Sequence, residues 1–249
     1  MIETIIILSV LVIILIAYII VNNLNLKKKI ELERKNACDE LFSMMLKGGY
    51  EKRVNDFKIY NKEVKKEGIV FVGDSLTENY NVYEYFKDYN VYNRGIGGDT
   101  TSGLLNRMKE SIYDLEPKVV VLLIGINDFQ LVENANVNTI FNNIKLIIKN
   151  IKENCPNTKI ILESLYPISK EENPKIDKLS VGIKDNNKIL ELNELLKTIE
   201  GVNYLDVNSS LQDKNGNIQL DYTVEGLHVN TYGYTIITNI IKGKLEEIL

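Results

Sequence analysis

The longest run of apolar positions in the chain lies at its N-terminus. Residues Ile5 to Val21 carry no charge, and only Ser9 and Tyr18 have polar side-chain atoms. A helix rises about 1.5 Å per residue, so the run is roughly 25 Å long, slightly less than the roughly 30 Å hydrocarbon core of a bilayer. Local thinning of the bilayer can cover the difference. The pattern predicts an uncleaved transmembrane anchor over residues 1–23.

Two other interpretations of this run fit less well. A cleaved signal peptide would have a basic segment before the run and an Ala-x-Ala-like cleavage site after it, and the sequence has neither. A core helix at the extreme terminus is rarely apolar on every side. Lys27, Lys28 and Lys29 follow the run and favour a cytoplasmic location for the rest of the chain, although the positive-inside rule is weak for one span before a large domain.

Residues 24–67 show a different pattern, with many Lys and Glu and with apolar side chains such as Val54 and Phe57 at helical spacing. This pattern predicts a charged helical stalk that is interrupted near Gly48 and Gly49. We expect a solvated spacer with part of one face packed on the following domain, and we assign it no chemistry.

From residue 68 to residue 249 the periodicity alternates between strand and helix. The predicted strands are Ile69–Val72, Val91–Tyr92, Val119–Ile124, Lys159–Leu162 and Asn203–Leu205. The predicted helices are Asn79–Phe86, Ser102–Tyr113, Asn138–Ile151, Lys184–Thr198 and Tyr232–Leu249. Almost uninterrupted apolar strands are typical of a parallel sheet covered by helices on both faces. The pattern therefore predicts an α/β fold, a three-layer α/β/α sandwich around a five-stranded parallel sheet.

Ligands of such sheets bind beyond the carboxyl ends of the strands, so functional residues are expected in the segments that follow each strand. The polar segment Pro167–Lys184 predicts a surface loop and is a candidate for a mobile rim of the site.

Composition excludes several classes of function. Thirty basic and 34 acidic residues give a net charge of −4, whereas nucleic-acid binders usually have a basic excess. Two cysteines without a Cys-x-x-Cys pair exclude a disulfide framework and a four-cysteine zinc site. His228 is the single histidine of the chain, so a reaction that uses imidazole must use His228.

The first polar motif, Gly73–Thr77, follows the first predicted strand. Ser75 lies between a strand and a helix, where its hydroxyl is at the sheet edge and its own N–H is at a helix N-terminus, as a nucleophile that generates an oxyanion requires. The alternative is a helix cap, because Glu78 stands three residues later at capping-box spacing. The motif is Gly-x-Ser-x-Thr and differs from the Gly-x-Ser-x-Gly elbow of α/β-hydrolases.

The second motif, Asn93–Thr101, contains three glycines in four residues, Gly95, Gly97 and Gly98. Such a loop can turn tightly and present bare N–H groups to an anion. A dinucleotide-binding loop is an alternative, but the final glycine of its fingerprint is missing. A plain turn capped by Asp99 or Thr100 is another.

Two further motifs follow later strands. Asn127 can offer its amide to an oxyanion or can close an Asx-turn. Glu225 and His228 are spaced so that the carboxylate can orient the imidazole and stabilise its protonated form, and the alternative is a structural or capping histidine. Because all four motifs fall at the same predicted sheet edge, their coincidence favours a catalytic site over four separate structural roles.

The four motifs together resemble the SGNH hydrolases, also called the GDSL esterase/lipase family, over about Ile69 to Leu249. The letters Gly-Asp-Ser-Leu at 73–76 match its first block, and Gly98, Asn127 and His228 fall in the other three. The glycine loop is most similar to the branch that includes platelet-activating-factor acetylhydrolase-like esterases. One departure is Glu225, where the family usually has Asp; Asp221 is a poor substitute for this acid.

The resemblance implies the flavodoxin-like SGNH fold and a membrane-anchored serine esterase that works through an acyl-serine intermediate. It implies Ser75 as nucleophile, His228 as general base and then acid, and Glu225 as the residue that orients His228. The N–H groups of Ser75 and Gly98 and the amide of Asn127 would form the oxyanion hole. No metal or organic cofactor is implied, and Asp74 and Arg94 are expected to be structural, with Arg94 alternatively a charge at the rim.

Three questions stay open at this stage. The substrate is an acyl ester of a lipid, a glycan or another small molecule, so a carbohydrate O-acetyl esterase or an acyltransferase is an alternative enzyme. A non-catalytic, membrane-tethered binding module is an alternative of another class. We expect no nucleic-acid partner, and the sequence does not indicate an oligomeric state.

Overall fold

The computed structural model describes residues 1–249, apart from the side chain of Val10. The chain divides into two compact units, Met1–Gly48 and Gly49–Leu249. Helix α1 (Ile2–Tyr60) contributes residues to both units.

The first unit contains the apolar part of α1. The most apolar 18-residue stretch of this helix has a mean hydropathy of 3.3, and none of it is buried. Length and composition therefore qualify the helix to cross a membrane, and a signal sequence near an N-terminus meets the same two criteria.

The predicted interruption near Gly48 and Gly49 is wrong, because α1 continues through both residues. Nothing lies within 4 Å of the position that a Cβ atom would take at either glycine. A glycine inside a helix costs only about 1 kcal/mol relative to alanine. The segment after Gly49 is held by tertiary contacts, among them those of the buried Phe57, and these outweigh that local cost.

The second unit is built on a five-stranded sheet with the order β2-β1-β3-β4-β5, in which all neighbours are parallel. The strands are β1 (Ile69–Gly73), β2 (Val91–Gly95), β3 (Val119–Leu123), β4 (Lys159–Glu163) and β5 (Asn203–Leu205). The fold predicted from the sequence is confirmed. In the register of the sheet, Gly73 at the end of β1 pairs with Gly95 of β2 and Leu123 of β3, so the segments after these three strands begin at one edge.

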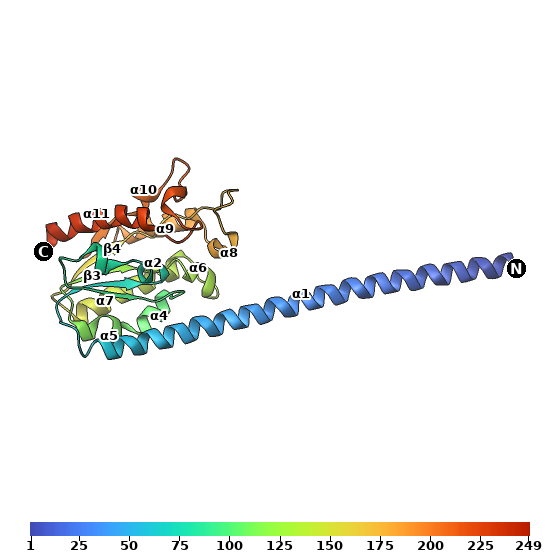
Figure 1. Cartoon of the computed structure of the whole chain (residues 1–249), viewed down its shortest axis with the longest axis horizontal. Coiled ribbons are helices and arrows are strands. Elements are labelled where there is room, and N and C mark those ends of the chain that lie inside the picture. Colours follow the sequence, from blue (N-terminus) through green and yellow to red (C-terminus); the bar gives the residue numbers. More distant parts are fainter. The chain divides into compact units, whose positions relative to one another are not determined.

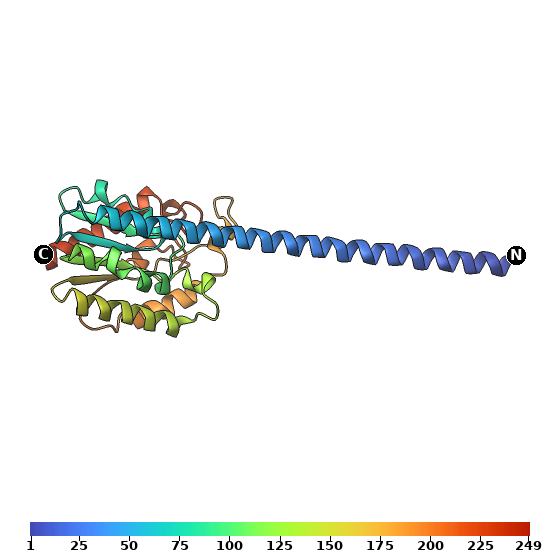
Figure 2. The same ribbon diagram turned by 90° about the horizontal axis from the view of Figure 1, so that it is seen from below.

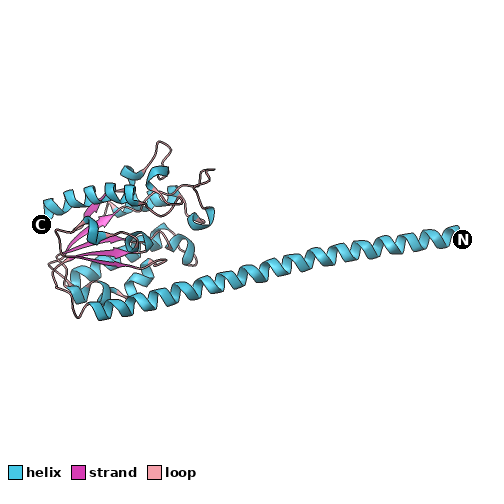
Figure 3. Ribbon diagram, in the orientation of Figure 1, coloured by secondary structure: helices cyan, strands magenta, loops and turns pink.

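Helices cover both faces of this sheet. Helices α4 (Thr101–Asn106), α5 (Met108–Ser111) and α7 (Val137–Asn154) lie on one face and α11 (Thr231–Ile248) lies on the other, with the strands between them (Figures 1 and 3). In the view from below, α7 lies at one edge of its helical layer (Figure 2). Its buried residues recur every three or four positions, which is the spacing of one helical face: Val137, Ile140, Ile144, Ile147, Ile148 and Ile151.

The remaining helices are short, except α9. They are α2 (Ser75–Glu78), α3 (Val82–Tyr85), α6 (Asp128–Leu131), α8 (Lys178–Val181), α9 (Asn186–Leu196) and α10 (Asn208–Leu211), with 3-10 turns at Tyr113–Leu115 and Leu220–Tyr222. The predicted helix Ser102–Tyr113 is therefore divided into α4 and α5, and the predicted helix Asn79–Phe86 is reduced to the single turn of α3. The segment 167–184 is loop apart from the single turn of α8, as the sequence predicts.

Candidate active site

The segment after β1 places Ser75 at the start of a helix. Asp74 is the N-cap of α2, and its Oδ1 accepts a hydrogen bond from Leu76 N at 2.9 Å. The alternative of a Ser75–Glu78 capping box is therefore wrong. Glu78 Oε2 accepts instead from Gly97 N, at 2.7 Å, and the Ser75 side chain has no capping role.

The Ser75 hydroxyl contacts the single histidine. His228 Nε2 lies 3.0 Å from Ser75 Oγ, and His228 Nδ1 lies 2.5 Å from Glu225 Oε1. The same carboxylate oxygen accepts from the backbone N–H of His228 at 3.2 Å. The side chains of His228 and Glu225 are 30% and 16% exposed, and Ser75 is half-buried, so the line of hydrogen bonds lies at the surface of the unit and not in its core.

A tight turn brings Glu225 and His228 together. Thr223 Oγ1 donates to the carbonyl of His228 and accepts from Gly226 N, each at 2.8 Å. Gly226 has φ +104°, and a Cβ atom there would lie 2.7 Å from the carbonyl oxygen of Ser169. The N-cap of α11 is Asn230, which accepts from the N–H groups of its first turn. The alternative that His228 caps this helix is therefore wrong.

The glycine loop after β2 passes beside Ser75. A Cβ atom on Gly97 would lie 4.0 Å from Ser75 Cβ. Gly98 has φ +72°, a left-handed conformation that favours glycine. Thr100 is the N-cap of α4, and its side chain accepts from Gly103 N. The loop is thus both a capped turn and a set of backbone amides next to the nucleophile.

Asn127, after β3, reaches across to this loop. It is the N-cap of α6 without making a side-chain cap, and its Nδ2 donates to the carbonyl of Asp99 at 3.0 Å. The expected alternative of an Asx-turn is not formed. Because a carboxamide has two N–H donors, one can hold the loop while the other is free for a ligand. Ser75, Gly98 and Asn127 are thereby gathered at one sheet edge, although their roles stay a prediction.

A buried arginine that the sequence analysis missed supports the loop from below. Arg107 is fully buried between α4 and α5, and its Nε donates to Asp99 Oδ2 at 2.7 Å. Its other nitrogens donate to the carbonyls of Arg94 and Gly73, at the ends of two strands, at 2.8 and 2.9 Å. Burial raises the pKa of Asp99, and the Arg107 charge opposes that rise. The sequence signal that could have indicated a buried arginine is the position of Arg107 between Leu104 and Met108, two apolar residues that are four positions apart in a helical pattern.

A second buried carboxylate holds the start of α4. Asp128 accepts from Thr101 N at 2.9 Å and from the Thr101 hydroxyl. Asn143 of α7 donates to the same hydroxyl at 2.8 Å. The residue after Asn127 therefore fixes the helix that follows the glycine loop.

Two residues expected to be structural have surroundings that fit this view. Asp74 is fully buried, burial raises its pKa to about 7, and its Oδ2 has no hydrogen-bond partner among the described residues. Arg94 is 2% exposed, so it is not at a rim, and its guanidinium lies 4.8 Å from the centre of the Phe57 ring.

The side chain of Asp221, the poorer candidate acid, is exposed, and the carboxylate that contacts His228 belongs to Glu225.

An open hollow of 620 Å³ adjoins His228. Asn79, Asn81, Glu84 and Tyr85, which follow Ser75 in the chain, line it on one side. Within the described part of the chain, no three His, Cys, Asp or Glu side chains are grouped so that they could hold a metal ion.

Comparisons with known proteins identify the family of the chain. The sequence matches the GDSL-like lipase/acylhydrolase family over residues 71–236. It is 30% identical over 194 residues to the human platelet-activating factor acetylhydrolase IB subunit alpha2. The aligned region covers 74% of this chain and 79% of that subunit.

Two solved structures extend the likeness. A Streptococcus pneumoniae protein, provisionally described as a platelet activating factor, has a TM-score of 0.75 and 31% identity over 83% of this chain and 97% of its own. A GDSL-like lipase from Bacteroides thetaiotaomicron has a TM-score of 0.69 and 26% identity over 79% of this chain and 98% of its own. The resemblance read from the four motifs is confirmed, and the chain belongs to the GDSL-like lipase/acylhydrolase family of ester hydrolases.

Proposed function

We propose that this ester hydrolase is a membrane-anchored serine esterase that works through an acyl-serine intermediate. The observation that carries the proposal is the unbroken line of contacts from Ser75 Oγ to His228 Nε2 and from His228 Nδ1 to Glu225 Oε1. A nucleophile within hydrogen-bond reach of a base that is oriented by a third group is the arrangement that nucleophilic acyl transfer requires.

In the first half of the reaction, His228 Nε2 takes the proton of Ser75 as Oγ bonds to the carbonyl carbon of the ester. The negative charge moves to the carbonyl oxygen, where the N–H groups of Ser75 and Gly98 and the amide of Asn127 receive it. His228 then gives its proton to the leaving alcohol, and an acyl-serine remains. Water attacks this ester in the same way and releases the acid, which returns Ser75 and His228 to their starting forms.

Glu225 takes the role of the acid that holds the imidazole. Its contact with Nδ1 requires a proton on that nitrogen, which leaves Nε2 of the neutral ring free to accept from Ser75. Between Glu225 and His228 the chain turns at Gly226, whose positive φ few other residues tolerate.

Anchoring through residues 1–23 rests on the unburied apolar stretch of α1. We expect a chain that lacks residues 1–48 to be soluble and to keep wild-type kcat, because all proposed catalytic groups belong to the second unit. Membrane fractionation of the full and shortened chains measures this. A full-length chain in the soluble fraction, or a cleaved N-terminus, would reject the anchor and leave the esterase proposal unaffected.

A second candidate, a carbohydrate O-acetyl esterase, is favoured by the hollow beside His228. The leaving alcohol must lie on the His228 side of Ser75, because His228 protonates it. The hollow that His228 lines together with Asn79, Asn81 and Glu84 offers amide and carboxylate groups to a hydroxyl-rich alcohol.

A substrate panel separates these candidates. We would compare kcat/KM for p-nitrophenyl esters from acetyl to palmitoyl with the release of acetate from acetylated oligosaccharides. Preference for long chains supports a lipid substrate, and acetate release from the oligosaccharides supports the second candidate. Transfer of the acyl group to an added alcohol would show an acyltransferase. Ser75→Ala is expected to lower turnover by several orders of magnitude, because only the oxyanion hole then remains. If the wild-type protein turned over none of these esters, the result would favour the non-catalytic binding module.

A further inference from the structure

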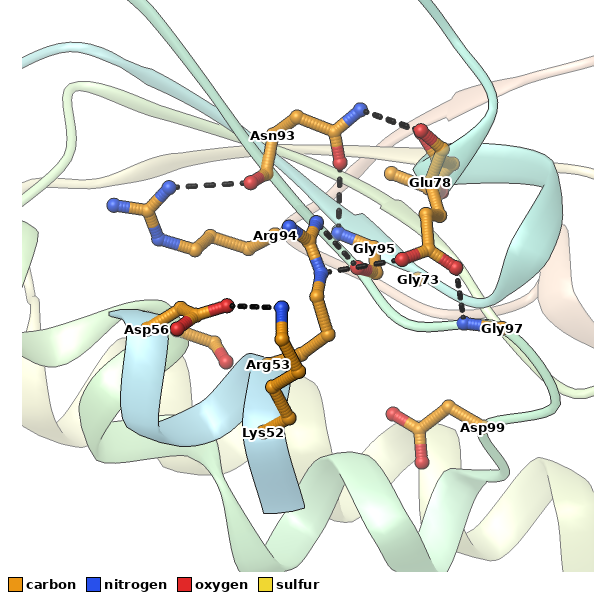
Figure 4. A network of polar contacts seen from close by, with 12 residues as sticks. Lys52, Arg53, Asp56, Gly73, Glu78, Asn93, Arg94, Gly95, Gly97 and Asp99 are labelled. Carbon is orange, nitrogen blue, oxygen red and sulfur yellow. Dashed lines mark hydrogen bonds and ion pairs between the residues drawn. The ribbon is translucent and has the colours of Figure 1, made fainter. Parts of the chain in front are cut away.

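The last turns of α1, which belong to the second unit, contact the segments that form the candidate active site (Figure 4). Tyr50 donates its hydroxyl hydrogen to the carbonyl of Gly103 in α4 at 2.8 Å. Arg53 Nη2 donates to the carbonyl of Gly95, the last residue of β2, at 3.1 Å. The segment is therefore attached to the glycine loop at the point where the loop leaves the sheet and at the helix that follows it.

Arg53 also holds the carboxylate that contacts the loop. Its Nε lies 3.1 Å from Glu78 Oε1, an ion pair rather than a hydrogen bond because Nε has no hydrogen-bond partner. The other oxygen of Glu78 accepts from Gly97 N at 2.7 Å. Gly97 immediately precedes Gly98, whose N–H we place in the oxyanion hole. Arg53, Glu78 and Gly97 thus form one line of contacts from the helix to the loop.

The backbone and the side chain of Glu78 are fixed by different partners. Asn93 Nδ2 donates to the carbonyl of Thr77 at 2.7 Å and so ties α2 to β2. The Glu78 side chain is 33% exposed, and Arg53 is its cationic partner. A long, partly exposed side chain loses considerable entropy when it is held in one rotamer. Without Arg53, we expect the carboxylate to turn into solvent and to release Gly97.

The position of the helix does not depend on this ion pair. Phe57, four residues after Arg53, is 1% exposed, and the guanidinium of Arg94 lies on its ring. Arg94 Nη2 donates to Asn61 Oδ1 at 2.8 Å. Arg53, Phe57 and Asn61 recur every four residues and share one helical face. Shortening Arg53 also removes its guanidinium from the Phe57 ring, 4.9 Å away, but it leaves the contacts of Phe57 and Asn61 with Arg94 in place.

We propose that Arg53 is a positioning residue of the oxyanion hole, which acts through Glu78 on the amide of Gly97. The proposal rests on the proposed serine-esterase function and extends it to a segment to which the sequence assigned no chemistry. It also implies that the catalytic unit begins near Gly49, whereas the sequence places its boundary at residue 68.

The test compares Arg53→Ala with Lys52→Ala in the full chain. Lys52 is the neighbouring residue, its side chain is 76% exposed, and it pairs with Asp56 on the same helix. Loss of one oxyanion donor lowers kcat by about 10²- to 10³-fold, so a displaced donor is expected to cost roughly tenfold. We expect Arg53→Ala to lower kcat for p-nitrophenyl acetate about tenfold with KM and the acidic limb of the pH profile unchanged, and Lys52→Ala to match wild type.

Two further variants separate positioning from a loss of folding. Arg53→Lys keeps a cation near Glu78 and should recover part of kcat; it also serves as the test if Arg53→Ala does not fold. Glu78→Gln removes the charge that pairs with Arg53. Because the two residues act in one line, kcat of the double variant Arg53→Ala/Glu78→Gln should be no lower than kcat of the slower single variant. Equal kcat in Arg53→Ala and Lys52→Ala, a change in KM alone, or fully additive losses would overturn the proposal. Wild-type turnover and its loss in Ser75→Ala test the esterase itself, so the two failures are distinct.

Discussion

On one side of Ser75 the candidate site consists of side chains that contact each other. On the other side it consists mainly of the backbone amides of the glycine loop, which other residues hold in place, together with the side chain of Asn127. The contacts of Ser75, His228 and Glu225 are direct. The glycine loop is held at a distance, by Arg107 through Asp99 and by Arg53 through Glu78. A backbone amide has no side chain with which to fix its own direction, so the precision of this second side depends on residues that never touch a substrate.

The largest expected effect is on the side of direct contacts. Glu225→Gln keeps the size of the side chain and removes its charge, so the protonated imidazole of the transition state loses its partner. We expect kcat to fall on the order of 10⁴-fold, the loss that follows when the acid of such a triad is replaced. Asp221→Asn is the matched control and should leave kcat unchanged. If Asp221→Asn is inactive and Glu225→Gln is active, the acid has been assigned to the wrong residue.

A smaller loss is expected from the oxyanion side. Asn127→Ala removes a donor that we place in the oxyanion hole and also the hydrogen bond to the Asp99 carbonyl. We expect kcat to fall by about 10²- to 10³-fold with little change in KM, because the interaction develops only in the transition state. A normal kcat in the purified variant would place Asn127 among the structural residues of the loop.

The supports beneath the loop should affect stability as well as rate. Arg107→Met removes the partner of Asp99 and leaves a buried carboxylate without a counter-charge, which typically costs 3–5 kcal/mol. Urea unfolding measures this loss. The double variant Arg107→Met/Asp99→Asn should recover part of it, since no charge is then left unpaired. If the double variant is less stable than Arg107→Met, the hydrogen bonds to the Gly73 and Arg94 carbonyls matter more than the charge pair.

The smallest of the expected effects concerns Asp74 and the pH dependence of stability. Burial raises its pKa from an ordinary value near 3.8 to about 7. Between these values the folded chain keeps a proton that the unfolded chain has lost, so the free energy of unfolding falls as the pH rises from about 4 to about 7. Asp74→Asn should remove a fall on the order of a few kcal/mol.

Unfolding of wild type and Asp74→Asn in urea at pH 5 and pH 8 measures this difference. Part of the fall should persist in the variant, because the buried Glu163 also has its pKa raised to about 7. An identical change with pH in the two proteins would mean that Asp74 is already ionised at pH 5.

The same division decides what the sequence could predict. The strands and the four motifs could be read because a parallel sheet brings the segments after its strands to one edge whatever the details of packing. Glu225 and His228 could be paired because they lie three residues apart. Arg53 and Arg107 could not be identified, because their partners at Glu78 and Gly73 are distant in sequence and a charge in a helical pattern usually indicates a solvated position. The same reason explains why α1 passes through Gly48 and Gly49, where local propensity predicted a break.

The assignment of Ser75 as the nucleophile is tested most directly by mapping a covalent adduct. The full chain is treated with a fluorophosphonate, which phosphonylates an activated serine, and the modified peptide is identified by mass spectrometry. We expect one adduct per chain, on Ser75, with labelling strongly slowed in His228→Ala and absent in Ser75→Ala. An adduct on another residue, or wild-type protein that hydrolyses esters without being labelled at Ser75, would contradict this assignment.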